Sequence, residues 1–254
     1  MNFEIRQLSP WEDKKMPAFK EWLDEQIKLR PEDWGADFRI YVEMKARESE
    51  TKNKYQELTA EEKREKTFRR YLDGLNITEQ ELTGKSILDV GCKEGDFIVS
   101  CIEKGIAPNA YGIDKALEGG SVNSEYGNNF FVGDFTEELP VKNLDYVVSV
   151  GALSLYLDEE HKIDAEVAIS EAINAINEKG EIRIWPIKKA LGGNNSDGIK
   201  ESERVLAEIM VKLEKQTSIE WRLEPTDIRV GVDKDVWAEQ VLIIRCKPFL
   251  DKGK

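Results

Sequence analysis

The sequence has few of the residues that build metal sites and disulfide frameworks. Among 254 residues there are three cysteines and one histidine. The cysteines, Cys92, Cys101 and Cys246, are odd in number and lack the paired spacing of zinc ligands. This pattern predicts neither disulfides nor a structural zinc site, and we expect a protein with reduced thiols and no bound metal.

Long apolar runs are also absent. No stretch approaches the roughly 18 consecutive apolar residues of a membrane-spanning helix. The first residues, "MNFEIRQLSPWEDKK", lack the basic-then-apolar order of an export signal. We therefore expect a soluble, cytoplasmic protein that does not bind a membrane.

Basic residues are too few to balance the acidic ones, with 37 Lys and Arg against 50 Asp and Glu. The formal net charge is -13 and the isoelectric point is near 4.8, which opposes general attraction to phosphate backbones. We therefore expect a small-molecule substrate rather than a nucleic acid. Residues 45–70 are an exception, because basic residues outnumber acidic ones there. A solvated helix face is the simplest interpretation of that stretch, and an RNA-contacting surface is the alternative.

The first part of the chain reads as helices. "PAFKEWLDEQIKLRP" has apolar residues at helical spacing, and "TAEEKREKTFRRYLDGLN" opens with a Thr59 cap and stops near Gly74. We predict an N-terminal helical cap over residues 1–82 and a main domain over 83–254. Four aromatic residues of the cap are candidates for an acceptor pocket or for ordinary packing: Trp22, Trp34, Phe38 and Tyr41.

From Gly84 onward, short β-branched runs alternate with longer amphipathic ones. The strand candidates are "SILDV", "AYGID", "NFFVGD", "LDYVVSV", "EIRIWPI", "SIEWRLEP" and "EQVLIIRCK". Such alternation predicts an α/β fold with a mostly parallel sheet. The last two candidates follow one another without a convincing helix, so we expect a terminal antiparallel hairpin joined by a loop carrying "DIRVGVDKDVWA".

Acidic residues stand at the ends of three successive strand candidates. Asp89 ends the first, Asp114 the second, and Asp134 follows the third. Ligands of open parallel sheets bind at the carboxyl ends of strands. A pyrophosphate would need glycine where Lys93 stands, and it would be repelled by Asp89, so a nicotinamide or flavin cofactor is disfavoured. A cofactor with a cationic amino group, a ribose diol and an adenine suits these acids better.

Asp89-Val90-Gly91-Cys92, followed by Gly95, resembles the first motif of class I S-adenosylmethionine-dependent methyltransferases. The resemblance spans about Gly84 to Lys247 and implies a Rossmann-like, mostly parallel seven-stranded sheet, with S-adenosylmethionine as cofactor. Lys93 fits this motif if its φ is negative and its side chain points outward. The implied cofactor residues are Asp89, Gly91, Cys92 and Gly95 at the methionine end, Asp114 and Lys115 at the ribose, Asp134 and Phe135 at the adenine, and Val150 and Gly151 at the far edge.

The sequence indicates the residues of the methyl-transfer step less clearly than those of the cofactor site. His161, the single histidine, and Tyr156 follow the fourth strand and are candidates for a base and a pocket residue, although a lone exposed histidine is usually an ordinary surface residue. The motifs that amino-directed and cytosine-carbon DNA methyltransferases carry after this strand are absent. We predict methyl transfer to a small molecule. RNA methylation and a catalytically inert binding or scaffold protein are the alternatives.

Overall fold

The computed structural model describes Glu25, Lys28, Leu29 and residues 58–119, 124–190, 196–232 and 235–247. The chain divides into two compact units, Met1–Lys63 and Arg64–Lys254. The sheet belongs to the second unit. The four aromatic residues of the predicted cap, candidates for an acceptor pocket or for ordinary packing, and residues 45–57 of the basic stretch lie outside the described residues. The use of residues 1–82 as an accessory cap stays a prediction.

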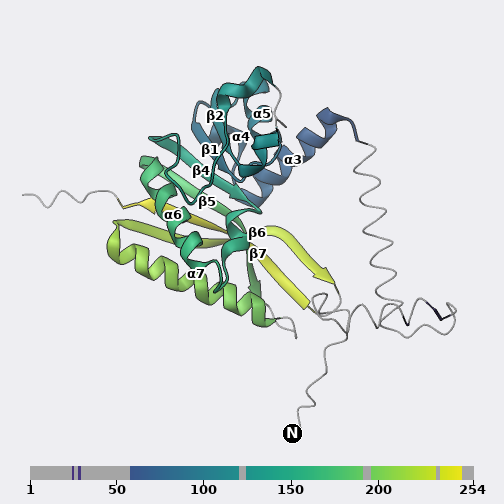
Figure 1. The fold of residues 1–254 in the computed structure, drawn as a ribbon, viewed down its shortest axis with the longest axis vertical. Coiled ribbons are helices and arrows are strands. Elements are labelled where there is room, and N and C mark those ends of the chain that lie inside the picture. Colours follow the sequence, from purple (N-terminus) through teal and green to yellow (C-terminus); the bar gives the residue numbers. More distant parts are fainter. Residues whose placement is uncertain are drawn as a thin grey trace, which may run out of the picture. The chain divides into compact units, whose positions relative to one another are not determined.

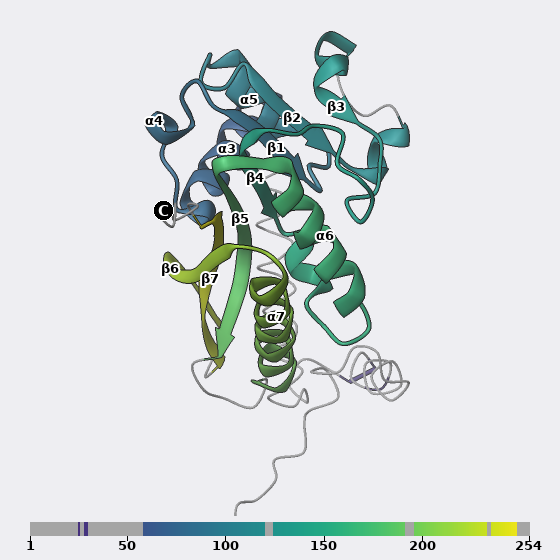
Figure 2. The ribbon, with the colours of Figure 1, turned by 90° about the vertical axis from the view of Figure 1, so that its left-hand side faces the viewer.

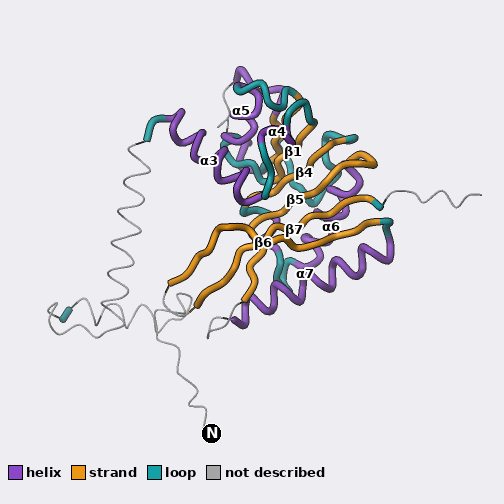
Figure 3. Tube along the Cα trace, turned by 180° about the vertical axis from the view of Figure 1, so that it is seen from behind, coloured by secondary structure: helices purple, strands orange, loops and turns teal. Residues whose placement is uncertain are grey.

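Seven strands form one sheet in the order β3-β2-β1-β4-β5-β7-β6 (Figure 3). Strands β1 to β5 pair in parallel, whereas β7 runs antiparallel to both β5 and β6. The predicted Rossmann-like methyltransferase fold, mostly parallel with a terminal antiparallel hairpin, is confirmed. The strands are β1 Ser86–Val90, β2 Asn109–Ile113, β3 Phe130–Phe131, β4 Leu144–Val150, β5 Ile176–Ala190, β6 Ile219–Val232 and β7 Asp235–Cys246.

Helices cover both faces of the sheet (Figures 1 and 2). Side chains from α6 and α7 pack on one face, and side chains from α3, α4 and α5 pack on the other. Three short 3-10 turns, η2 Lys115–Gly119, η3 Ser124–Asn129 and η4 Leu153–Tyr156, follow strand ends or precede β3. Among the described residues from 58 onward, the helices are α3 Ala60–Leu75, α4 Glu79–Leu82, α5 Asp96–Glu103, α6 Lys162–Ala175 and α7 Ser196–Gln216.

The sheet separates two hydrophobic cores. In β1, Leu88 belongs to the core beneath α6 and α7, while its neighbour Ile87 belongs to the core beneath α3, α4 and α5. Successive side chains of a strand point to opposite faces, and both faces are buried here. This explains why the first strand reads as a continuous apolar run rather than as an alternating pattern.

The prediction of a loop over residues 227–238, between the last two strands, was wrong. Strand β6 continues to Val232 and β7 begins at Asp235, so most of residues 227–238 lie in paired strands. Ile228, Val230 and Val232 are β-branched and recur at every second residue. That spacing is the period of a strand, and it outweighs the glycine and charged residues between them.

Arg183 of β5 closes the C-terminal end of α3. Its side chain is 5% exposed and donates hydrogen bonds to the carbonyl oxygens of Leu75 (3.0 Å) and Asn76 (2.5 Å). It also donates to Glu181 (2.9 Å), which pairs with Arg245 as well. The last carbonyls of a helix lack partners within the helix. A buried guanidinium therefore fixes α3 to the sheet.

We expect Arg183→Gln to lower the free energy of unfolding by about 3 kcal/mol or more, because it removes a buried guanidinium that pairs with Glu181 and leaves the helix carbonyls of Leu75 and Asn76 without their donor. Arg222→Gln is the matched control. Arg222 is 43% exposed and pairs with Glu224 on the same strand, and exposed pairs contribute about 1 kcal/mol or less. Urea unfolding of both variants measures the difference, and equal losses would contradict the structural role of Arg183.

Candidate functional site

The predicted cofactor residues converge on one edge of the sheet. Strands β1, β2, β3 and β4 are parallel, so their carboxyl ends lie on the same side. Asp89 is the penultimate residue of β1, Asp114 follows β2, Asp134 lies just beyond β3, and Gly151 follows β4. The three acids and the glycine therefore border one region.

The turn after β1 is fastened to the ends of β2 and β4. The Gly91 amide donates to the carbonyl of Ile113 (2.9 Å), and the Lys93 amide donates to Oδ2 of Asp114 (2.8 Å). Gly91 has φ +79°, and a Cβ at this position would lie 2.2 Å from the Cβ of Ala152. Only glycine fits there, because the backbone of the turn lies directly against the residues that follow β4.

Lys93 departs from the expectation of a negative φ. Its φ is +49°, in the left-handed region that glycine adopts freely and lysine adopts at a cost. The turn imposes this conformation while the Lys93 amide bonds Asp114 and the Gly95 amide bonds the carbonyl of Cys92. The lysine side chain is exposed.

Asp89 is fully buried, and its carboxyl has one partner. The hydroxyl of Tyr71, on α3, donates to Oδ2 of Asp89 over 3.0 Å. Oδ1 has no hydrogen-bond partner in the described part of the chain. Burial raises the pKa of Asp89 to about 7, and the nearby Asp114 adds to the increase although the Tyr71 bond opposes it. A buried acceptor with an unused oxygen is costly to leave unpaired, which makes Oδ1 of Asp89 a candidate for a ligand contact.

Tyr71 is a site residue that sequence reasoning missed. It is buried, and its ring stacks on Phe97 with centroids 4.3 Å apart. Burial raises the pKa of the Tyr71 hydroxyl well above its usual value, as does the adjacent Asp89. A signal was present in the sequence. Tyr71 shares the apolar stripe of its helix with Phe68, Leu72 and Leu75, and a buried tyrosine hydroxyl requires a partner.

Asp114 uses both oxygens to organise the backbone. Oδ2 accepts the Lys93 amide and Oδ1 accepts the Ala116 amide, each over 2.8 Å. The residue is only half-buried. An ionised carboxylate can accept about four hydrogen bonds, so each oxygen retains capacity for a hydroxyl donor.

Asp134 is already paired with a lysine. The ammonium of Lys115 lies 2.5 Å from Oδ2, and the Thr136 amide donates to Oδ1 over 3.0 Å. Burial would raise the pKa of Asp134, but these hydrogen bonds outweigh burial and hold the pKa below its usual value. Lys115 is 65% exposed at its side chain. The ammonium of Lys115 therefore balances the charge of the Asp134 carboxylate before any ligand binds.

Three aromatic rings join the adenine end of the predicted site to the candidate base. Phe135 meets Tyr156 edge to face with centroids 5.3 Å apart, and Tyr156 meets His161 in the same way at 5.2 Å. Nδ1 of His161 lies 2.9 Å from Oδ1 of Asp158. Phe135 thus links both candidate catalytic residues to the predicted cofactor site. Tyr156 ends η4, and His161 immediately precedes α6.

Cys92 is a packing residue of the turn. It is buried, and its sulfur would lie 2.7 Å from a Cβ at Gly112. Burial raises the pKa of the Cys92 thiol, and Asp89 raises it further, so the nucleophilic thiolate is disfavoured. Gly95 in the same turn has φ +77°, and a Cβ there would lie 2.2 Å from the ring of Phe130. The turn is therefore closely packed on its protein side.

The strand ends of β1 and β4 are also joined directly. The hydroxyl of Ser149 donates to the carbonyl of Val90 (3.0 Å) and accepts the amide of Leu153 (3.1 Å). The Gly151 amide donates to the carbonyl of Trp185 over 2.8 Å, and a Cβ at Gly151 would meet nothing within 4 Å. Val150 is buried, so the open space lies over Gly151.

Among the described residues, no three His, Cys, Asp or Glu side chains are grouped closely enough to hold a metal ion. None of the helices there has the length and apolar character needed to cross a bilayer.

No family model and no curated protein sequence matches this chain. Magnesium protoporphyrin IX methyltransferase of Synechocystis, solved with bound S-adenosylmethionine, is 17% identical over 65% of this chain and 72% of its own, with a TM-score of 0.39. A TehB-like S-adenosylmethionine-dependent methyltransferase of Corynebacterium glutamicum is 19% identical over 72% and 98%, with a TM-score of 0.37. A phosphoethanolamine N-methyltransferase of Haemonchus contortus is 14% identical over 72% and 53%, with a TM-score of 0.46. Likeness at this level does not establish an activity.

The burial of Asp89 predicts a pH-dependent stability. Its pKa of about 7 lies above the unfolded value near 4, so the folded chain holds its proton while the unfolded chain loses it. Stability should therefore fall as pH rises from about 4 to about 7. We expect Asp89→Asn to remove this loss and to be more stable than the wild type at pH 8 by at least about 1 kcal/mol.

Tyr71→Phe provides the matched test of that assignment, because it keeps the ring that stacks on Phe97. A hydrogen bond to a charged acceptor contributes about 1.5–3 kcal/mol and one to a neutral acceptor about 1 kcal/mol. Tyr71→Phe should therefore cost more at pH 8 than at pH 5 in the wild type, and equally at both in Asp89→Asn. Denaturant unfolding of the four proteins gives the cycle, and a pH-independent cost in the wild type would contradict ionisation of Asp89.

The positive φ of Lys93 predicts an unusual response to glycine. Glycine normally lowers stability by about 0.5–1 kcal/mol through the entropy of the unfolded chain, but here it also removes a backbone strain of about 1 kcal/mol. We expect Lys93→Gly to be neutral to about 1 kcal/mol stabilising, and Glu94→Gly to destabilise by about 0.5–1 kcal/mol. Thermal unfolding compares them, and equal destabilisation would exclude strain at Lys93.

Proposed function

We propose that this protein transfers a methyl group from S-adenosylmethionine to a small-molecule acceptor. The observation that carries the proposal is the fully buried carboxyl of Asp89, whose Oδ1 has no partner among the described residues, at the edge where Asp114 and Asp134 also lie. A buried anionic oxygen of this kind requires a cationic donor. The cofactor's methionine amino group is such a donor.

The other acids fit the rest of the same molecule. Asp114 is half-buried and retains acceptor capacity for ribose hydroxyls. Asp134, with Phe135 beside it, would accept the adenine amino group, and the Lys115 ammonium would then share that carboxylate. The open space over Gly151 would take the far edge of the cofactor. A dinucleotide fits poorly, because its pyrophosphate would face Asp89 and Asp114.

The bound cofactor would supply an electrophilic methyl group. The chain's own contribution is to hold an acceptor in line with that methyl group and to remove a proton where the acceptor carries one. His161 is suited to the second task, because its Nδ1 is held by Asp158 and its Nε2 is left for the acceptor. Tyr156 packs against His161 and would form one wall of the acceptor pocket.

A catalytically inert binding or scaffold protein is the second candidate, and the existing partners of two acids favour it. Asp134 is paired with Lys115, and both oxygens of Asp114 accept backbone amides. These acids are satisfied without a ligand. Binding of S-adenosylhomocysteine without turnover on an acceptor panel would favour this reading. The small-molecule acceptor and a cytoplasmic location both stay predictions, as does the RNA alternative.

The decisive experiment is calorimetric titration with S-adenosylhomocysteine. We expect Asp114→Ala to weaken binding about tenfold or more, since one charged hydrogen bond contributes more than about 1.4 kcal/mol. Glu94→Ala, which removes an exposed acid of the same turn, should leave the affinity within about twofold. Unfolding of each variant without ligand separates a lost contact from a damaged fold. An unchanged affinity in Asp114→Ala would contradict the assignment of Asp114 to the ribose hydroxyls.

The same titration over pH tests Asp89. Its pKa of about 7 means that a cationic ligand must compete with a proton below neutrality. The affinity of the wild type should therefore rise from pH 6 to pH 8, and that of Asp89→Asn should be weaker and pH-independent. A rise of equal size in Asp89→Asn would show that another group carries the dependence.

A further inference from the structure

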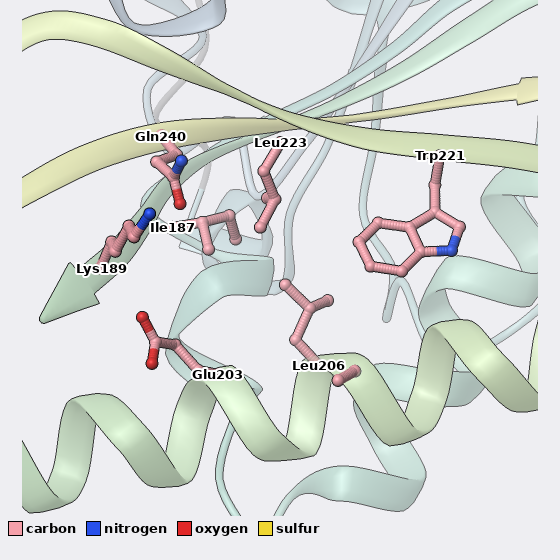
Figure 4. Close-up of a pocket in the computed structure, with 8 residues that line it drawn as sticks. Ile187, Lys189, Glu203, Leu206, Trp221, Leu223 and Gln240 are labelled. Atoms are coloured by element: carbon pink, nitrogen blue, oxygen red, sulfur yellow. The ribbon is translucent and has the colours of Figure 1, made fainter.

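A cavity of about 330 Å³ lies between α7 and the antiparallel end of the sheet. Side chains from four elements line it, and Figure 4 shows them converging from the sheet above and the helix below. None of these residues belongs to the predicted cofactor site. They are Ile187 and Lys189 of β5, Glu203, Leu206 and Ala207 of α7, Trp221 and Leu223 of β6, and Gln240 of β7.

Two irregularities of the sheet account for the cavity. Gln240 pairs with Ile187 on one side and with Pro225 on the other. The β5–β7 register shifts between Ile184 and Ile187, and the β6–β7 register shifts just after Pro225. Such irregularities bend strands locally and are common beside binding sites. The sheet is thus interrupted on both sides of β7 at the level of the cavity.

The lining of the cavity is polar at one end and apolar toward the other. The polar tips of Lys189, Gln240 and Glu203 gather at one end, and the indole of Trp221 stands at the other (Figure 4). Ile187, Leu206 and Leu223 lie between them. Ile187 and Leu206 are buried, whereas Lys189 and Ala207 are exposed, so the cavity is accessible from solvent. A ligand with a polar group would place that group at the polar end, with its apolar part directed toward the indole.

The donors at the polar end of the cavity determine which polar group of a ligand fits there. Glu203 already takes part in an interaction of its own. Lys189 forms no ion pair, and the amide of Gln240 no hydrogen bond, with any residue that the structure describes. An ammonium and an amide with an available N–H are both donors. They complement a carboxylate, with which charge-assisted hydrogen bonds form.

We propose that this cavity is a binding site for a small apolar carboxylic acid, with its carboxylate on Lys189 and Gln240 and its apolar body against Leu206, Leu223 and Trp221. A cavity of 150 Å³ holds benzene. The volume of about 330 Å³ therefore suits about a dozen non-hydrogen atoms, an aryl or branched alkyl acid. The site goes beyond the proposed function, since it uses none of the cofactor residues.

The experiment titrates the full chain with 4-phenylbutyrate, a probe of this size and charge, without any cofactor. The readout is the indole N–H signal of Trp221 in protein labelled at its six tryptophans, assigned with Trp221→Phe. We expect saturable binding with a Kd of about 1 mM or tighter, in line with the affinity that a ligand of this size reaches. The uncharged analogue 4-phenylbutanol should bind at least about fivefold more weakly.

Matched variants locate the probe. Ala207→Phe fills the cavity from α7 and should weaken binding at least about tenfold, whereas Val211→Phe adds the same ring at an exposed position of that helix outside the lining and should not. Lys189→Met should abolish the preference for the carboxylate over the alcohol. Lys188→Met, on the opposite face of the strand, should leave it intact.

Three outcomes would overturn the proposal: no saturable binding of 4-phenylbutyrate, equal binding in Ala207→Phe and wild type, or equal affinity for the acid and the alcohol. Asp114→Ala should bind the probe as the wild type does. Failure of S-adenosylhomocysteine to bind would therefore leave this result untouched, so the two proposals fail separately.

Discussion

A carboxyl group buried without solvent at the end of β1 is the feature on which the rest of the candidate site depends. Burial of Asp89 carries a free-energy cost, and the single hydrogen bond from Tyr71 offsets only part of it. The other oxygen, Oδ1, has no hydrogen-bond donor among the described residues. The raised pKa of Asp89 follows from this one placement, and the proposed contact with a cationic ligand rests on it.

Helix α3 is the element that makes this placement possible. Tyr71 reaches Asp89 because Phe68, Leu72 and Leu75 bury the same side of the helix in the core. Gly74 allows the helix to lie against the indole of Trp185, where a Cβ would come within 2.6 Å of the ring. The helix is therefore part of the compact unit that holds the sheet, and it supports the site from the face opposite α6 and α7.

The remaining acids are organised differently from Asp89. Asp114 ties the turn after β1 to β2 through backbone amides, and Asp134 is neutralised by Lys115. A ligand at Asp114 or Asp134 would form its hydrogen bonds beside existing ones or in place of them. The net free energy from each new hydrogen bond is therefore smaller than the strength of that bond alone. In the proposed site, Asp89 would therefore gain most from a ligand, and Asp114 and Asp134 would orient it.

The sequence by itself determined the strand pattern, the mostly parallel sheet and the acids at three strand ends, because strand periodicity and glycine-containing turns are local properties. It misread the residues between the last two strands, where the pairing partner extends β6 and β7. The left-handed φ of Lys93 accompanies a hydrogen bond from its amide to Asp114, twenty-one positions away. Only the tertiary structure decided the contact of Tyr71 with Asp89, the pairing of Lys115 with Asp134 and the cavity beneath α7. Each of these joins side chains from different elements, and no local pattern specifies which elements will meet.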